Sequence, residues 1–188
     1  EEFGRGADAL KILSLITVVV GRTEKEAQNK LEDYRRHASV EASLAHYSAS
    51  VGIDFSKYGL DDVIDRNSTN ANQSALAAIT KQAAKPVTLR DIIDQMVLGS
   101  RMKPMVGSPD QIADHLTAWI EESGIDGFNL ARTVAPESLR DFVELVVPVL
   151  QERGVFKADY AAGPLRQKLF GGGNGRLPAA HPAAQFRR

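Results

Sequence analysis

The stretch that decides the fold runs from residue 102 to residue 156 and reads MKPMVGSPDQIADHLTAWIEESGIDGFNLARTVAPESLRDFVELVVPVLQERGVF. Ser108 is a good N-cap, Pro109 suits the first helical position, and Gln111 completes a capping box. Gly124 is the predicted C-cap of this helix. One face of the helix carries five apolar residues: Ile112, Ala113, Leu116, Trp119 and Ile120. This pattern predicts a helix that begins at Ser108 and ends at Gly124.

The residues after this helix predict a strand and a second helix. Ile125 to Ala131 is short and apolar, as is typical of a strand buried in a parallel sheet. Pro136 opens the second helix, which ends near Gly154 and turns five apolar residues inward: Leu139, Phe142, Val143, Val146 and Leu150. Helix, buried strand and helix joined by short loops form the repeat unit of an α/β fold.

The N-terminal part of the chain predicts the same unit. Lys11 to Val20 (KILSLITVVV) reads as a buried parallel strand, and Thr23 with Glu26 forms a second capping box. The helix that follows is expected to run to about Ser50, with one inward stripe: Ala27, Leu31, Tyr34, Ala38, Ala42 and Ala45.

The middle and the end of the chain are less regular. Residues 51–100 are expected to form a mostly helical insertion, with an ordered apolar excursion over 52–69 and helices over Ser74 to Ala84 and, capped by Thr88, over Leu89 to Leu98. Residues 171–188 (GGGNGRLPAAHPAAQFRR) are low in complexity and are expected to be a disordered tail.

Composition excludes several classes of protein. The formal net charge of −1 gives no reason to expect a nucleic-acid or membrane partner, and no apolar run approaches the roughly 18 residues of a transmembrane helix. The chain has no cysteine, which excludes disulfides and thiolate chemistry and agrees with a cytoplasmic location. The four histidines lack metal-ligand spacing, so we expect no metal site.

Several stretches together resemble a known family. VGSPDQIADHLTAWIEESGIDGFNL (106–130), LRDFVELVVPVLQERGVF (139–156), LKILSLITVVVGRTEKEAQNKL (10–31) and VGIDFSKYGLDD (51–62) resemble the C-terminal end of bacterial-luciferase-like flavin-dependent monooxygenases. The resemblance is greatest to the branch that holds the nitrilotriacetate, EDTA, dibenzothiophene-sulfone and long-chain alkane monooxygenases, and it covers roughly residues 8–170.

The resemblance implies a fold, a cofactor and partners. Residues 1–170 are expected to be the C-terminal part of a (β/α)8 barrel, a fold that needs roughly 200 residues or more, so the chain reads as a fragment of a longer enzyme. Such enzymes take reduced FMN from a separate flavin reductase and oxidise a small organic substrate with O2 through a flavin hydroperoxide. The resemblance also implies a homo-oligomer and places most flavin and catalytic residues upstream of residue 1. The substrate and the catalytic residues stay unidentified.

Four residues are candidates for the site. Asn129 and Arg132 lie at the carboxyl end of the last predicted strand, where barrel enzymes place their chemistry. Asn129 either binds barrel backbone or faces the substrate or flavin. Arg132 either pairs with Glu137 or Asp141 or binds an acidic substrate.

The other two candidates lie before and at the start of the first helix. Ser108 is expected above all to cap its helix, and a helix N-terminus of this kind can also hold a flavin phosphate. Met102 lies where several family members place an active-site histidine. Since this chain has none there, we expect Met102 at the substrate pocket, with Arg101 or Lys103 as a possible cation.

A second hypothesis needs no catalysis. The chain could be a truncated α/β-helical module that binds a partner through its exposed apolar edge. The two hypotheses differ in what they require of the strands Lys11 to Val20 and Ile125 to Ala131, because two buried parallel strands need further neighbours or leave open edges.

Overall fold

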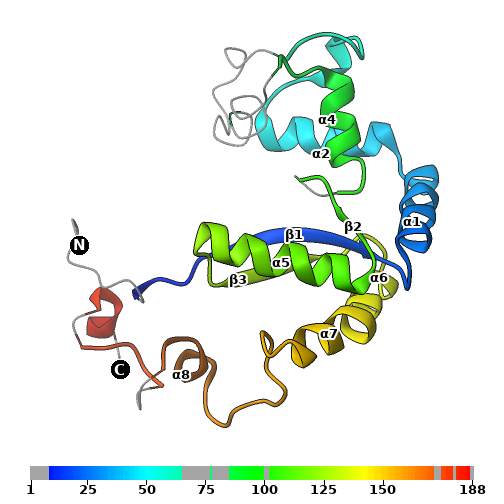
Figure 1. Ribbon diagram of the computed structural model, residues 1–188. Coiled ribbons are helices and arrows are strands. Elements are labelled where there is room, and N and C mark those ends of the chain that lie inside the picture. Colours follow the sequence, from blue (N-terminus) through cyan, green and yellow to red (C-terminus); the bar gives the residue numbers. More distant parts are fainter. Residues whose placement is uncertain are drawn as a thin grey trace.

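The computed structural model describes residues 9–64, 77, 85–99, 102–171, 175–179 and 181–186 of the 188-residue chain. Its centre is a parallel sheet in the order β2-β1-β3 (Figure 1). Val18 of the middle strand pairs with Met105 on one side, and Leu13 pairs with Gly127 on the other. The predicted α/β class is therefore confirmed. The strands are β1 (Leu13–Val20), β2 (Met105–Gly107) and β3 (Gly127–Ala131).

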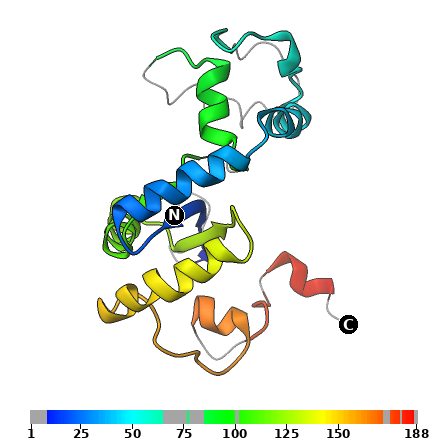
Figure 2. The ribbon, with the colours of Figure 1, turned by 90° about the vertical axis from the view of Figure 1, so that its right-hand side faces the viewer.

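Helices lie on the sheet and in a second lobe beyond it, and α1 runs between the two parts in both views (Figures 1 and 2). The sheet part carries α5, α6 and α7, and the second lobe holds α2 and α4. The α-helices are α1 (Glu24–His37), α2 (Val40–Val51), α4 (Leu89–Met96), α5 (Pro109–Ser123), α6 (Glu137–Asp141), α7 (Val147–Glu152) and α8 (Leu165–Phe170). Shorter turns are the 3-10 helices η2 (Phe55–Lys57) and η5 (Pro182–Phe186) and the π-helical turn η4 (Phe142–Val146).

The helix α5 begins and ends where its sequence predicts. The Ser108 hydroxyl accepts a hydrogen bond from the Gln111 amide, the Gln111 side chain accepts one from the Ser108 amide, and Gly124 ends the helix in the left-handed conformation. Of the predicted inward residues, Ile112, Ala113 and Leu116 are buried. They pack against one face of β1, through Ile16, Val18 and Val20, and against the helical segment after β3, through Phe142, Val146 and Leu150.

The insertion builds a core of its own. Tyr47 and Val51 of α2, Phe55 of η2, and Leu89 and Ile92 of α4 are all buried in one cluster. The rings of Tyr47 and Phe55 stack with centroids 5.4 Å apart. Thr88 caps α4 through a full capping box with Asp91, as the sequence predicts. The apolar segment after Gly52 is thus ordered, and it packs on α2 and α4. The predicted helix Ser74–Ala84 lies outside the described residues, apart from Ala77.

The long helix predicted from Thr23 to Ser50 is wrong in its length. Residues 38–39 leave the helical conformation, and Ser39 caps a new helix through a hydrogen bond to the Ala42 amide. After the break the inward face changes: Tyr47 and Val51 are buried, whereas Ala42 and Ala45 of the predicted stripe are exposed. The break redirects the chain from the sheet to the second lobe (Figure 2).

Two expectations about burial in the α/β unit are also wrong. The strand β3 is only half-buried to exposed, because its outer edge has no strand beside it within the described residues. In the helical segment after Pro136, Leu139 and Val143 are both 52% exposed. The buried face of this segment consists of Phe142, Val146 and Leu150, which lie four residues apart. Leu139 and Val143 share a neighbouring face that stays exposed within the described residues.

The last part of the chain stands apart from the sheet. Among its described residues, η5 and α8 form short helices without a buried residue. The disordered tail predicted for residues 171–188 stays a prediction, since part of that segment lies outside the described residues.

Candidate functional site

The carboxyl ends of the three parallel strands meet at one edge of the sheet. The Gly21 amide donates to the Gly107 carbonyl over 3.3 Å and so continues the pairing of β1 with β2 past the strand end. The Gln111 side chain donates to the Glu24 carboxylate over 3.0 Å, which links the first turns of α5 and α1 at this edge. In parallel sheets ligands bind outside the carboxyl ends of the strands, so this edge is the place to look for a site.

A hollow of about 390 Å³ lies at this edge. The segment after β3, the last turn of α1 and the segment after α4 form its walls. This volume falls within the range of roughly 300–1,000 Å³ that small-molecule sites occupy. The lining residues are Asp33, Tyr34, His37, Ala38, Val97, Leu98, Thr133, Val134 and Glu137.

Thr133 gives this hollow a polar group that lacks a partner. Its hydroxyl oxygen is buried and has no hydrogen bond among the described residues. The backbone beside it is fixed, because the Thr133 amide donates to the Ser138 hydroxyl, which itself donates to the Val134 carbonyl over 2.9 Å. A buried polar atom left unpaired in this way costs roughly 1–3 kcal/mol, and a ligand would recover that free energy only if neighbouring side chains moved to expose the oxygen.

A phenol and a carboxylate face each other on the same wall. Burial raises the pKa of the Tyr34 phenol, and the hydrogen bond to Glu137 and the charge of that carboxylate raise it further. The phenol is therefore neutral at physiological pH and acts as a hydrogen-bond donor. With Asp33 and Glu137 both present, this hollow suits a neutral polar group better than an anion.

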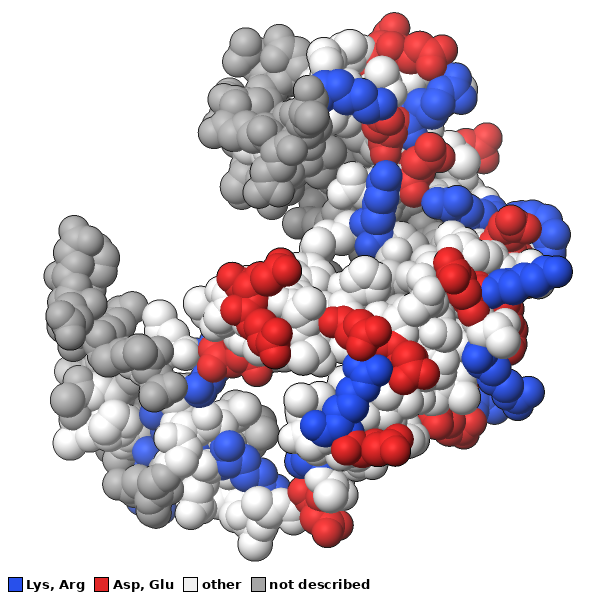
Figure 3. Space-filling model, in the orientation of Figure 1, with Lys and Arg blue, Asp and Glu red and all other residues white. Residues whose placement is uncertain are grey.

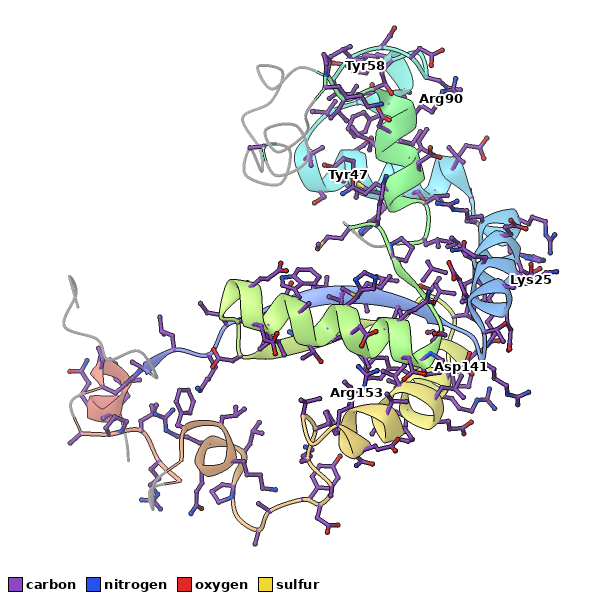
Figure 4. The ribbon with its side chains drawn as sticks, viewed as in Figure 1. Lys25, Tyr47, Tyr58, Arg90, Asp141 and Arg153 are labelled. Carbon is purple, nitrogen blue, oxygen red and sulfur yellow. The ribbon has the colours of Figure 1, made fainter. Side chains whose placement is uncertain are left out.

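Lys30 ties α1 to α6 beside the hollow. Its ammonium lies 2.6 Å from the Asp141 carboxylate and 3.9 Å from that of Glu137, and it donates to the Val20 carbonyl at the end of β1 over 3.4 Å. Figure 4 shows Asp141, the last residue of α6, at the end of the sheet that lies near α1. This ammonium therefore partly neutralises the acidic wall and holds the two helices in place.

Comparison with known proteins identifies the family. The family described as luciferase-like monooxygenase matches residues 1–127 of the chain. The chain belongs to the luciferase-like monooxygenase family. The sequence resemblance that predicted it is thereby confirmed.

Its relatives include several enzymes of different substrates. Dimethyl-sulfide monooxygenase of Hyphomicrobium sulfonivorans is 39% identical over all 188 residues. Long-chain alkane monooxygenase of Geobacillus thermodenitrificans is 40% identical over 189 residues. Nitrilotriacetate monooxygenase component A of Aminobacter aminovorans is 33% identical over 89% of the chain. In each case the match spans only 38% or 39% of the relative's own length.

Solved structures give the same result. The crystal structure of DmoA from Hyphomicrobium sulfonivorans matches 98% of this chain with a TM-score of 0.80 and 38% identity, over 39% of its own length. A riboflavin lyase structure, which holds a modified FMN and the substrate riboflavin, matches 98% of this chain with a TM-score of 0.82 and 32% identity, over 40% of its own length. The arrangement described above is therefore one that longer proteins share, one of which holds a modified FMN.

Asn129 lies in β3 of this luciferase-like chain, on an exposed face of the sheet. It pairs in register with Leu15 of β1, so the two side chains share the sheet face opposite α5. Both are exposed, Leu15 to 49%, so the expectation of a buried asparagine is wrong for this structure. Its role toward a substrate stays a prediction.

Arg132 does not make the ion pair that the sequence allows. Lys30 binds Asp141, and Glu137 faces both Lys30 and Tyr34. Within the described part of the chain Arg132 forms no ion pair, and it lines a small hollow of about 100 Å³ beside Ser138 and Phe142. A guanidinium without a carboxylate partner at the strand end is free for an acidic ligand.

Ser108 is confirmed as a helix cap. The capping box occupies its own amide and that of Gln111, and Arg153 lies 3.0 Å from the Asp110 carboxylate and neutralises it (Figure 4). The Ser108 hydroxyl proton and the Asp110 amide are the donors left at this helix start. Met102 is 41% exposed just before β2, and Arg101 lies outside the described residues.

Most residues that line the hollow were not predicted as site residues. Thr133 follows the last predicted strand, which is a usable signal, but Lys30 and Tyr34 read as ordinary surface and stripe positions of a helix. Within the described residues no group of three His, Asp or Glu side chains is placed to hold a metal. None of the helices described here is both long and apolar enough to cross a membrane.

Proposed function

We propose that this chain is the C-terminal part of a two-component monooxygenase that uses reduced FMN and O2 to oxidise a small organic substrate. The observation that carries the proposal is identity of 39% and 40% to two monooxygenases over the whole chain. The chain spans 39% and 38% of their lengths, so in this proposal the rest of the site comes from polypeptide that resembles the rest of those relatives.

In this proposal β1 and β3 are neighbouring strands of a (β/α)8 barrel, and residues 51–100 are an insertion in it. The exposed end of one sheet face supports this reading. Leu13 and Leu15 are 46% and 49% exposed there, beside Asn129, whereas Val19, farther along the same face of β1, packs against α1, and the opposite face is covered by α5 and η4. A parallel sheet is normally covered on both faces, so this face belongs inside a larger structure.

FMN, when bound, supplies the activation of O2 and the oxidising equivalents. The residues of this chain fit part of that cofactor. Thr133 offers an unpaired hydroxyl and Tyr34 a neutral phenol to its uncharged polar atoms. The acidic hollow disfavours the phosphate, for which Ser108 and the Asp110 amide are the better candidates at the start of α5.

The substrate would lie over the carboxyl end of β3. Asn129 and Arg132 alternate between the two faces of that strand, so in this proposal Asn129 faces the barrel interior and Arg132 reaches a substrate only from the rim. Met102 lies just before β2, and its apolar, adaptable side chain would meet the substrate from that neighbouring strand. The relatives named above act on a sulfide, an alkane and an aminocarboxylate, and the class of substrate here stays open.

Two partners follow from the proposal. A separate flavin reductase would supply reduced FMN. The nitrilotriacetate relative is named component A, which supports an enzyme of more than one component. A second copy of the chain is the other partner, as the homo-oligomer prediction has it.

A chimera tests the proposal. This chain replaces the matching 39% of dimethyl-sulfide monooxygenase, and the chimera is checked for folding by its circular dichroism and melting temperature. Reduced FMN is then titrated in under anaerobic conditions, and product formed under ¹⁸O2 is analysed by mass spectrometry with dimethyl sulfide and long-chain alkanes.

The proposal predicts saturable binding of reduced FMN and one ¹⁸O atom in the product. A chimera that folds and melts cooperatively but binds no reduced FMN contradicts it. Replacement of Thr133 by Val in the same chimera tests the hydroxyl alone, because valine has nearly the shape of threonine without its hydroxyl. The variant is expected to fold, with weaker binding of reduced FMN.

A further inference from the structure

A second hollow lies against the candidate site, between α2 and the end of α4. Its volume is about 290 Å³. Its lining residues are Ser39, Ala42, Ser43, His46, Tyr47, Ser50, Met96, Val97 and Gly99. Among these described residues there is no Asp, Glu, Lys or Arg, whereas the hollow of about 390 Å³, called the first hollow from here on, is lined by Asp33 and Glu137. The second hollow therefore suits an uncharged group (Figure 3 shows where the charged side chains lie on one face).

Two short segments form the partition between the hollows. At the break between α1 and α2, Ala38 lines the first hollow and Ser39 lines the second. After α4, Leu98 lines the first hollow, and Val97 is the one described residue that lines both. The Ser43 hydroxyl donates to the Val97 carbonyl over 3.2 Å and so ties the partition to α2. The two hollows thus lie back to back, with Val97 between them.

The lining of the first hollow becomes apolar where it meets the partition. Its polar side chains come from α1 and from the segment after β3: Asp33, Tyr34, His37, Thr133 and Glu137. Its apolar lining residues are Ala38, Val97, Leu98 and Val134. Three of these four belong to the partition. A molecule that places a polar group beside the Tyr34 phenol would therefore point an apolar tail toward Val97.

We propose that Val97 is a specificity-determining residue that limits the length of the apolar tail of the substrate. The substrate class is an uncharged molecule with a short apolar tail. In this assignment, which rests on the proposed function, the end that is oxidised lies beside the flavin on the polar side of the first hollow, and the tail ends against Val97. The Val97 amide donates to the Ile93 carbonyl over 2.8 Å and its carbonyl accepts from Ser43, so its backbone is held on both sides and the size of its side chain decides how far the tail reaches.

A titration of the full chain with linear primary alcohols, followed by nuclear magnetic resonance, tests this assignment. The probes run from butanol to octanol, so their tails differ by one carbon at a time. The hydroxyl of each probe can accept a hydrogen bond from Tyr34, and its tail then points toward Val97. Amide shifts of Leu98 give the dissociation constant, and the amides of Ser43 and His46 report whether the tail enters the second hollow.

Three variants are compared with the wild type, and circular dichroism checks that each one folds. Val97→Ala removes two carbon atoms from the partition at a half-buried position. Ala42→Leu fills part of the second hollow alone, at an exposed position of α2 where leucine favours the helix. The third variant combines both substitutions, and it separates a tail that enters the second hollow from a general loosening of the first.

The wild-type affinity is expected to rise about fourfold with each carbon added to the tail, and to level off once the tail meets Val97. In Val97→Ala the rise continues for about two further carbons, so alcohols just beyond the wild-type limit bind at least about tenfold more tightly. The amides of Ser43 and His46 shift only in this variant. Ala42→Leu leaves the wild-type affinities within about twofold, and in the double variant it removes the gain.

Each of the following outcomes overturns the assignment. The affinity levels off at the same tail length in the folded wild type and in Val97→Ala, or the gain survives Ala42→Leu. The Ser43 and His46 amides already shift in the wild type, or the folded wild type binds none of the alcohols. A failure of the proposed function is seen separately, because a folded chimera that binds no reduced FMN contradicts that function, while the alcohol series still decides the role of Val97.

Discussion

The contact between Lys30 and Asp141 joins the two helices that wall the candidate site, and its loss makes a sharp prediction. Replacement of Lys30 by Met keeps most of the volume of the side chain and removes its charge. The Asp141 carboxylate, 2.6 Å from the ammonium, then loses its cation, and the Val20 carbonyl loses a donor. Glu137 and Tyr34 remain beside the unpaired carboxylate.

The exposed fractions of the two side chains set the expected magnitude. Both are mostly buried, with 21% of the Lys30 and 19% of the Asp141 side chain exposed. Exposed ion pairs contribute about 0.2–1 kcal/mol, and removal of one partner of a fully buried pair costs about 3–5 kcal/mol. We therefore expect the free energy of unfolding to fall by about 2 kcal/mol, between these limits.

Urea unfolding followed by circular dichroism measures this change. Lys25→Met on the same helix is the control, because Lys25 is exposed and forms no ion pair within the described residues (Figure 4), and it is expected to change the free energy by less than about 0.5 kcal/mol. The double variant with Asp141→Asn completes a cycle with a coupling energy of about 1 kcal/mol. Equal effects of the Lys30 and Lys25 replacements, or zero coupling, would refute the proposed contact.

Three further predictions concern the sheet edge and its caps. Ser108→Ala removes the helix cap and lowers the free energy of unfolding by about 1 kcal/mol, which thermal melts measure. Ser108→Asp keeps an equally good cap and so preserves the free energy of unfolding. If the Ser108 hydroxyl faces the phosphate, Ser108→Asp weakens the binding of reduced FMN in an anaerobic titration of the chimera. Gly21→Ala brings a methyl group to 2.5 Å from the Ala27 amide nitrogen, and we expect a loss of about 2 kcal/mol in urea unfolding, against less than about 1 for Gly59→Ala. The hydrogen bond from the Ile12 amide and the charge of the neighbouring lysine lower the pKa of Asp126, so its stabilisation is present above about pH 4 and is lost as pH falls through the folded-state pKa. Asp126→Asn therefore lowers the melting temperature at pH 7 but has little effect at pH 2, and an equal effect at both would contradict this.

Local signals predicted the starts and ends of helices well. Ser108, Thr88 and Gly124 act as the sequence predicts, because a capping hydrogen bond depends on residues only three or four positions apart. The Thr23 cap forms too, but the Glu26 carboxylate accepts from the Arg22 amide, one residue before the cap. The strands β1 and β3 were predictable for the same reason, since short apolar, β-branched runs are a local signal, whereas the three-residue strand β2 was not predicted.

The burial of β3 and the partners of Lys30 could not be predicted from local sequence signals. β3 is apolar in sequence but half-exposed here, because its burial depends on neighbours that these residues do not supply. Lys30 finds Asp141 and Glu137 from a helix more than 100 positions away in sequence, and no spacing rule links them. The break between α1 and α2 at Ser39 could not be predicted either, because the residues on both sides of it favour helix.

Anaerobic titration of reduced FMN into the protein isolated from its native source tests the central claim most directly. The quenching of flavin fluorescence or a change in its absorbance spectrum reports binding, and the chain is identified in the bound fraction by mass spectrometry. We predict saturable binding with one reduced FMN per copy. A native, folded protein that contains this chain and binds no reduced FMN at any concentration tested would contradict it.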